Sequence, residues 1–158
     1  MGGVRMFDAL GFKIRKYHMN EGHSSLLALE LMRRNGIDST KVKDMCIFTT
    51  HTPVEAGHDK FDYALVEDLI QDTSDIDTLR KFGGADRFDT SLFAMNLSNY
   101  INGVTKRHSR ISSAIYPGYK IQAITNGVHS YTWTTPYFRT LYDRYIPGWA
   151  NGQSFWYE

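Results

Sequence analysis

The sequence predicts an α/β fold in which helices flank a parallel sheet, because one pattern recurs at three places. A short apolar run leads directly into a polar loop after Met19, after Thr49 and after Ile124. Short apolar runs bounded by turn residues are typical of buried strands. Ligands bind at the carboxyl ends of strands in an open α/β sheet. We therefore expect the three polar loops to line one crevice.

The composition is that of a single globular domain. A chain of 158 residues can bury roughly 70% of the surface that its unfolded form exposes. With 18 Lys and Arg against 17 Asp and Glu, no overall field attracts nucleic acid or an anionic membrane. No apolar run approaches the ~20 residues of a membrane-spanning helix. The single cysteine, Cys46, excludes an internal disulfide and favours a reducing compartment, so we expect a cytoplasmic protein.

In the first half of the chain, turn and capping residues bound the expected elements. These are a helix over Arg5–Leu10, extended chain over Phe12–Met19, a helix from Glu21 to about Asn35, a connector with a possible helical turn over Ile37–Met45, and a buried strand over Cys46–Thr49. Asn20 is of a type that caps helices, so we expect it to begin the second helix. Gly36 is expected to end that helix.

The second half is expected to be mostly helical. The predicted elements are a helix over Phe61–Ile70, a mobile surface segment over Gln71–Thr90, a long helix over Leu92–Ile115, a strand over Lys120–Ile124 and a helix over Pro136–Tyr145. The long helix is predicted from apolar residues at separations of three and four. His108 lies on this apolar stripe and is interpreted as a hydrogen-bonded core residue. Gly103 would cost the helix about 1 kcal/mol relative to alanine, which indicates close approach of another backbone.

Histidines raise the question of a metal site, with His18, His23, His51 and His58 as candidates. A helical zinc pair needs a separation of three or four residues, whereas His18 and His23 are five apart across a predicted strand end. We therefore expect no metal site.

No motif for a nucleophile elbow, a P-loop or a dinucleotide-binding loop is present. Glu21 with Glu55 or Asp59 could form the carboxylate pair of a glycoside hydrolase, an alternative that depends on the distance between them. Asn and His side chains beside glycines at three strand ends are better suited to binding a sugar, because each directed hydrogen bond discriminates against a wrong ligand. For Asn20 and Glu21, simple helix capping is the competing interpretation.

Five stretches resemble the α-glucan phosphorylases (glycogen, starch and maltodextrin phosphorylases), particularly their shorter bacterial and archaeal type. The stretches are Gly2–Arg5, Tyr17–His23, Phe48–Asp59, Asn102–Val104 with His108–Ser109, and Ile124–Ser130 with Trp133. The resemblance implies phosphorolysis of α-1,4-glucans to glucose 1-phosphate with pyridoxal phosphate as cofactor. It also implies a two-domain GT-B fold, of whose amino-terminal Rossmann-like half this chain would form part.

Individual residues take expected roles from this resemblance. His51 is similar to a histidine that contacts the glucose 6-hydroxyl and whose backbone carbonyl faces the developing oxocarbenium charge. A dipole fixed near a forming cation is a strong form of electrostatic catalysis. Asn126 is similar to an asparagine that binds the same hydroxyl. The resemblance thus implies two catalytic residues, Glu21 and His51, and a substrate-binding set of Asn20, His23, Thr52, Asn126 and Gly127.

The animal and plant enzymes carry Asp-Thr-His where this chain has Glu21-Gly22-His23. Nothing in the sequence resembles the lysine that holds pyridoxal phosphate or the residues that bind substrate phosphate. We therefore expect residues 1–149 to be the second half of the amino-terminal domain, residues 150–158 to be a connector, and the fragment to be inactive and marginally stable alone. The alternatives are a free-standing carbohydrate-binding or regulatory module and the carboxylate-based hydrolase.

Overall fold

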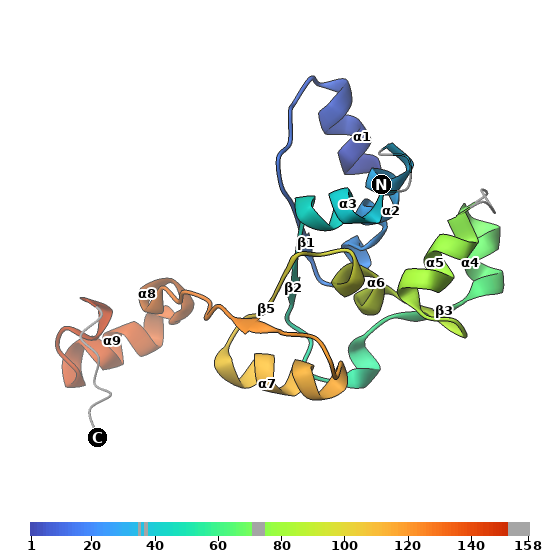
Figure 1. The fold of residues 1–158 in the computed structure, drawn as a ribbon. Helices are drawn as coiled ribbons and strands as arrows, with labels where there is room; N and C mark the ends of the chain where they lie inside the picture. The colour runs from blue at the N-terminus through green and yellow to red at the C-terminus, as the bar shows by residue number, and fades with distance from the viewer. Residues whose placement is uncertain (35, 37, 71–74, 152–158) are drawn as a thin grey trace. The chain divides into compact units, whose positions relative to one another are not determined.

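A computed structural model describes residues 1–34, 36, 38–70 and 75–151 (Figure 1). The chain divides into two compact units, one over Met1–Thr125 and one that begins at Asn126. In the described part of the chain, no helix is long and apolar enough to cross a membrane.

The first unit is built on a parallel sheet of four strands in the order β1-β2-β5-β6. Its strands are β1 Tyr17–Asn20, β2 Cys46–Thr50, β5 Tyr100–Gly103 and β6 Gln122–Ala123. The predicted α/β class with a parallel sheet flanked by helices is therefore confirmed. Because parallel strands end at the same edge, the loops that follow β1 and β2 lie next to each other.

Helices connect these strands, and a small antiparallel ribbon is added to them (Figure 1). The helices are α1 Gly2–Ala9, α2 Leu26–Arg34, α3 Ser39–Met45, α4 Tyr63–Ile70, α5 Ile76–Gly83, α6 Thr90–Asn96 and α7 Lys106–Ile115, with 3-10 turns η1 Gly22–Ser24 and η2 Glu55–Gly57. The ribbon pairs β3 Lys60–Asp62 with β4 Arg87–Asp89.

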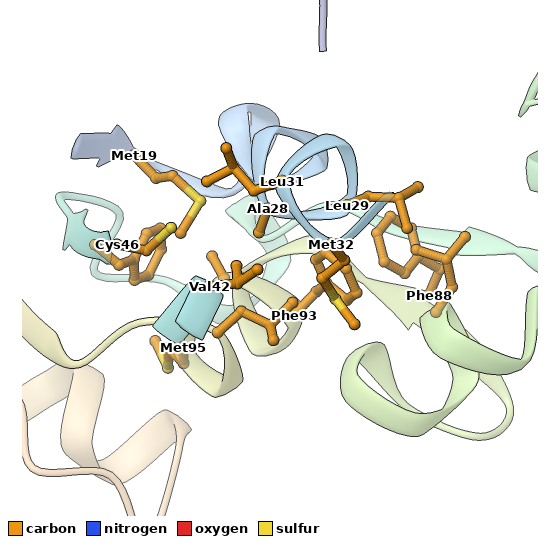
Figure 2. Close-up of a cluster of buried hydrophobic side chains, with 14 of the residues drawn as sticks. Met19, Ala28, Leu29, Leu31, Met32, Val42, Cys46, Phe88, Phe93 and Met95 are labelled. Carbon is orange, nitrogen blue, oxygen red and sulfur yellow. The ribbon is translucent and has the colours of Figure 1, made fainter. Parts of the chain in front are cut away.

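The core lies against one face of the sheet. The register aligns Met19, Phe48 and Ile101 across β1, β2 and β5, so their side chains share a face. Met19 and Phe48 are fully buried. Figure 2 shows side chains from β1, α2, α3 and α6 meeting in this cluster, among them Met19, Met32 and Phe93. The core thus holds β1 and β2 in the positions from which the candidate site is built.

The predicted long helix over Leu92–Ile115 is wrong, because the chain there forms α6, β5 and α7. The strand β5 gains backbone hydrogen bonds from neighbours on both sides, β2 and β6. A new helix begins after it because the Thr105 hydroxyl accepts a hydrogen bond from His108 N at 3.0 Å. His108 is buried as expected, but its Nε2 has no hydrogen-bond partner among the described residues.

The described part of the segment between α4 and α6, residues 75–89, contains more regular secondary structure than its composition indicated. Residues 71–74 of the predicted mobile segment lie outside the described residues. The rest of the segment contains α5, which buries Ile76 and Leu79, and β4. Similarly, the helix predicted over Phe61–Ile70 begins only at Tyr63, because the residues before it pair with β4 in the ribbon.

The second unit contains α8 Ser130–Trp133, α9 Pro136–Tyr145 and a 3-10 turn at Trp149–Asn151. The bounds of α9 are those predicted. Trp149 holds the turn against α9, because its Nε1 donates to Asp143 Oδ1 at 2.8 Å. The strand predicted over Lys120–Ile124 in the first unit is reduced to β6.

Candidate functional site

Two of the three predicted loops meet at the carboxyl edge of the sheet. Glu21 follows β1 and His51 follows β2, and these strands are direct neighbours. The backbone continues the pairing beyond the strand, because Glu21 N donates to Thr49 O at 2.8 Å. The expectation that these two loops come together is therefore confirmed.

The Glu21 carboxylate joins the two loops. Its Oε2 accepts hydrogen bonds from His51 N at 2.8 Å and from Thr52 Oγ1 at 2.9 Å, and a longer one from Thr50 Oγ1 at 3.4 Å. Its Oε1 accepts from Gly22 N at 3.2 Å. Glu21 is only 8% exposed, so these donors replace the water that the carboxylate loses on burial.

Two opposing effects set the pKa of Glu21. Burial by itself raises the pKa, because it disfavours the charged form. The hydrogen bonds from His51 N, the Thr52 hydroxyl and Gly22 N outweigh burial, so the pKa is lowered below its ordinary value of 4.5. Glu21 is therefore an ionised acceptor at neutral pH. A general acid in glycoside hydrolysis needs a raised pKa, so the hydrolase alternative that uses Glu21 as acid is disfavoured.

The predicted capping role of Asn20 is wrong. Asn20 is the last residue of β1 and is exposed, whereas Glu21 caps the η1 turn that precedes α2. Gly22, which begins η1, lies so close to the start of α6 that no side chain fits there. A Cβ added to Gly22 would lie 2.9 Å from Ser91 Oγ and 3.2 Å from Ser91 N.

The His51 side chain remains available to a ligand. It is 48% exposed, and its Nδ1 lies 3.6 Å from Glu21 Oε2. Thr52 is half-buried, with its hydroxyl already bound to Glu21. The backbone around His51 is therefore fixed, while its ring faces solvent.

His23 is exposed, unlike the buried Glu21 carboxylate, and lines a separate cavity. The cavity has a volume of about 240 Å³ and is also lined by Leu65 and Leu69 of α4. The walls of this cavity are mostly apolar. The predicted substrate-binding role of His23 stays a prediction.

His58 is an anchor that the sequence analysis missed. Its Nε2 lies 3.1 Å from Thr52 O, which can only accept, so Nε2 carries the proton. In the neutral ring, Nδ1 then accepts from Ser91 Oγ, 2.9 Å away. Tyr116 packs edge-on against this ring. Both ring nitrogens of His58 are thus used to hold the His51–Thr52 loop against α6.

The sequence signal for His58 is its place in the same polar loop, which by itself indicates only a possible metal ligand. Ser91 and Tyr116 have no such signal, because they come from distant parts of the chain. The pKa of Tyr116 is raised by burial and by the charge of Asp89, which accepts from the Tyr116 hydroxyl at 3.2 Å. Asp89 also caps α6 by accepting from Leu92 N at 2.8 Å.

The other proposed carboxylates have separate surroundings. The Glu55 side chain is 75% exposed and pairs with Lys60 Nζ at 3.6 Å. Asp59 is exposed. Asn126 and Gly127 belong to the second unit, so their expected place in the same crevice stays a prediction.

The lysines of the chain do not fit pyridoxal phosphate. A lysine that forms a Schiff base is usually held in a desolvated pocket. Here all lysines are exposed except Lys60, which is half-buried and pairs with Glu55 and Asp89. In the described ranges, no group of three or more His, Cys, Asp or Glu residues could hold a metal ion.

Comparisons with known proteins agree with the motifs. The chain is 32% identical to the maltodextrin phosphorylase of Thermococcus litoralis over 92% of its own length and 20% of that protein. It is 32% identical to the glycogen phosphorylase of Mycobacterium tuberculosis over 79% of its length and 18% of that protein. It is 27% identical to the glycogen phosphorylase of Aquifex aeolicus, with 92% and 24% covered.

No protein-family model matches the sequence. The chain spans about a fifth of the length of the curated relatives it matches, 18–24% in these three cases. The similarity nevertheless extends through most of this chain and includes the loops built around Glu21 and His51. The resemblance to the α-glucan phosphorylases that the sequence motifs indicated is therefore confirmed.

Proposed function

We propose that this chain works as part of an α-glucan phosphorylase and supplies glucose-binding loops to its active-site cleft. The enzyme would convert an α-1,4-glucan and phosphate into glucose 1-phosphate in the cytoplasm. The observation that carries the proposal is the arrangement at the sheet edge. A buried carboxylate accepts hydrogen bonds from the His51 backbone N–H and the Thr52 hydroxyl, while the His51 ring stays half exposed.

In this proposal the first unit is part of the amino-terminal Rossmann-like half of a GT-B fold. The His51 ring would bind the 6-hydroxyl of the reacting glucose, and the His51 carbonyl would face the positive charge that develops on the sugar. A carbonyl held in place before the reaction stabilises that charge without further reorganisation. Asn20, His23 and Thr52, with Asn126 and Gly127 from the second unit, would complete the sugar contacts.

The remaining parts of the reaction would come from residues outside this chain. Pyridoxal phosphate supplies a phosphate group for proton transfer in this family, and the lysines here do not fit it. The residues of this chain would therefore hold neither the cofactor nor the substrate phosphate. We expect the 158-residue chain by itself to release no glucose 1-phosphate.

The first test is to sequence the DNA on both sides of this reading frame and to express the complete frame. The product should release glucose 1-phosphate from maltoheptaose, and only when phosphate is present. His51→Ala should lower kcat/KM about 10-fold, the loss expected for one hydrogen bond to a buried hydroxyl. Glu55→Ala is the matched control in the same loop and should leave kcat/KM unchanged.

Two outcomes would contradict this proposal. Maltoheptaose binding without phosphorolysis, by a frame that ends near these residues, would favour the carbohydrate-binding module. Release of reducing sugar without phosphate would favour a hydrolase.

A further inference from the structure

Glu21 has an unusual backbone conformation. Its φ of 68° and ψ of 168° lie in a region that is almost confined to glycine. Among the described residues it is the only non-glycine residue with a positive φ. Such strain persists only where the surroundings enforce it, and it concentrates at functional sites.

The surroundings hold the Glu21 backbone from both sides. Its N–H donates to Thr49 O of the neighbouring strand at 2.8 Å. Its carbonyl accepts from Ser24 N at 3.2 Å and from Ser24 Oγ at 2.8 Å. In this conformation the carboxylate points toward the loop that follows β2, and its Oε2 accepts hydrogen bonds from His51 and Thr52 there.

The bonds to this loop fall on either side of one peptide group. Oε2 of Glu21 accepts from His51 N, which precedes the His51 carbonyl, and from Thr52 Oγ1, which follows it. Both bonds end on the same oxygen atom. The peptide between His51 and Thr52 therefore has two anchors and little freedom to rotate.

A second anchor acts on the next carbonyl. His58 Nε2 donates to Thr52 O at 3.1 Å, and His58 is itself buried against α6. Successive groups of the loop are thus tied to β1 through Glu21 and to α6 through His58. The His51 carbonyl lies between these ties.

We propose that Glu21 is a positioning residue, whose carboxylate fixes the His51–Thr52 peptide so that the His51 carbonyl is aligned before glucosyl transfer. The inference rests on the proposed phosphorylase function. It assigns Glu21 neither proton transfer nor sugar binding, because the carboxylate is buried and its oxygens accept four hydrogen bonds, from His51, Thr52, Thr50 and Gly22. Loss of the carboxylate should therefore act on the chemical step through His51.

The kinetic test uses the phosphorylase expressed from the complete reading frame. Glu21→Gln should lower kcat about 10- to 100-fold, the same range as for residues that orient metal ligands through a hydrogen bond, while KM for maltoheptaose changes less than about twofold. Glu21→Asp keeps the negative charge and should retain more of kcat than Glu21→Gln. Glu55→Gln is the control for loss of a carboxylate in the loop and should leave kcat unchanged.

A second measurement needs no activity. In the 158-residue chain, the His51 amide proton resonance should move upfield in Glu21→Gln, because a bond to a carboxylate is replaced by a weaker one. In the unsubstituted chain the same resonance should follow the titration of Glu21 in acid. If Glu21→Gln does not fold, the His51 amide proton resonance is measured in Glu21→Asp instead.

The two measurements separate the possible failures. An unchanged His51 resonance, or an unchanged kcat in a folded Glu21→Gln enzyme, overturns the positioning role. A large rise in KM with little change in kcat also overturns it, because that result indicates direct binding of sugar. If the resonance moves but the complete protein shows no phosphorolysis, the proposed function fails and the contact between Glu21 and His51 stands.

Discussion

Replacement of Gly103 by alanine tests β5, one of the two inner strands of the sheet. Gly103 ends β5, and a Cβ built on it would lie 2.8 Å from Ser109 Oγ, 3.1 Å from Ser109 N and 3.2 Å from Ser109 Cα. Ser109 cannot move aside easily, because it lies within α7 and its hydroxyl proton is shared between Gln122 O at 2.7 Å and Thr105 O at 3.1 Å. The added methyl group must therefore push α7 away from the sheet.

The sign of the change in unfolding free energy distinguishes the strand β5 from the helix that the sequence predicted for this segment. Overpacking of this kind lowers the free energy of unfolding by about 1–3 kcal/mol. If Gly103 lay inside a helix, alanine would instead raise it by about 1 kcal/mol. Gly3→Ala is the matched control, because Gly3 lies in α1 and a Cβ added to it would meet nothing within 4 Å. That control should be neutral or stabilising.

Urea denaturation followed by far-ultraviolet circular dichroism measures the change. With a slope of about 2 kcal/mol per molar urea, a loss of about 2 kcal/mol lowers the midpoint by about 1 M. Tryptophan fluorescence reports separately on the second unit, because Trp133, Trp149 and Trp156 all follow Thr125. A Gly103→Ala midpoint equal to or above that of the unsubstituted chain would refute the packing of β5 against α7.

Three further predictions follow from single contacts. Thr105→Ala should cost about 1 kcal/mol of unfolding free energy, measured in urea, and more than Thr135→Ala, since only the Thr105 side chain caps its helix. Hydrogen bonds from Arg5 help to lower the pKa of Glu30 below 4.5. The free energy of unfolding should therefore decrease as the pH is lowered from about 4.5, and it should decrease less in Glu30→Gln. An equal decrease in the two proteins would contradict this. Burial raises the pKa of the Cys46 thiol to about 12. At pH 8, a disulfide reagent should therefore react with Cys46 in the urea-unfolded chain and hardly at all with Cys46 in the folded chain.

Several features could be predicted from local sequence because their causes are local. The β2 strand is a short apolar run with polar residues on either side, and α9 begins at Pro136, which suits the first turn of a helix. The motif around Glu21 and His51 identified two adjacent loops because parallel strands end at one edge. The sequence therefore predicted the α/β class, the sheet edge that carries the candidate site, and two of its residues.

Other features depend on partners that are distant in the chain. Apolar residues around β5 have spacings that suit a helix, and the segment becomes a strand because β2 and β6 supply backbone hydrogen bonds on both sides. Glu21 replaces Asn20 as the cap because Thr49 and His51 bind it across the strand boundary. Helix periodicity and capping preferences describe neighbours along the chain. These contacts join distant residues, as in the pairing of Asn102 with Gln122 and the hydrogen bond from Glu21 N to Thr49 O, so only the folded structure could decide them.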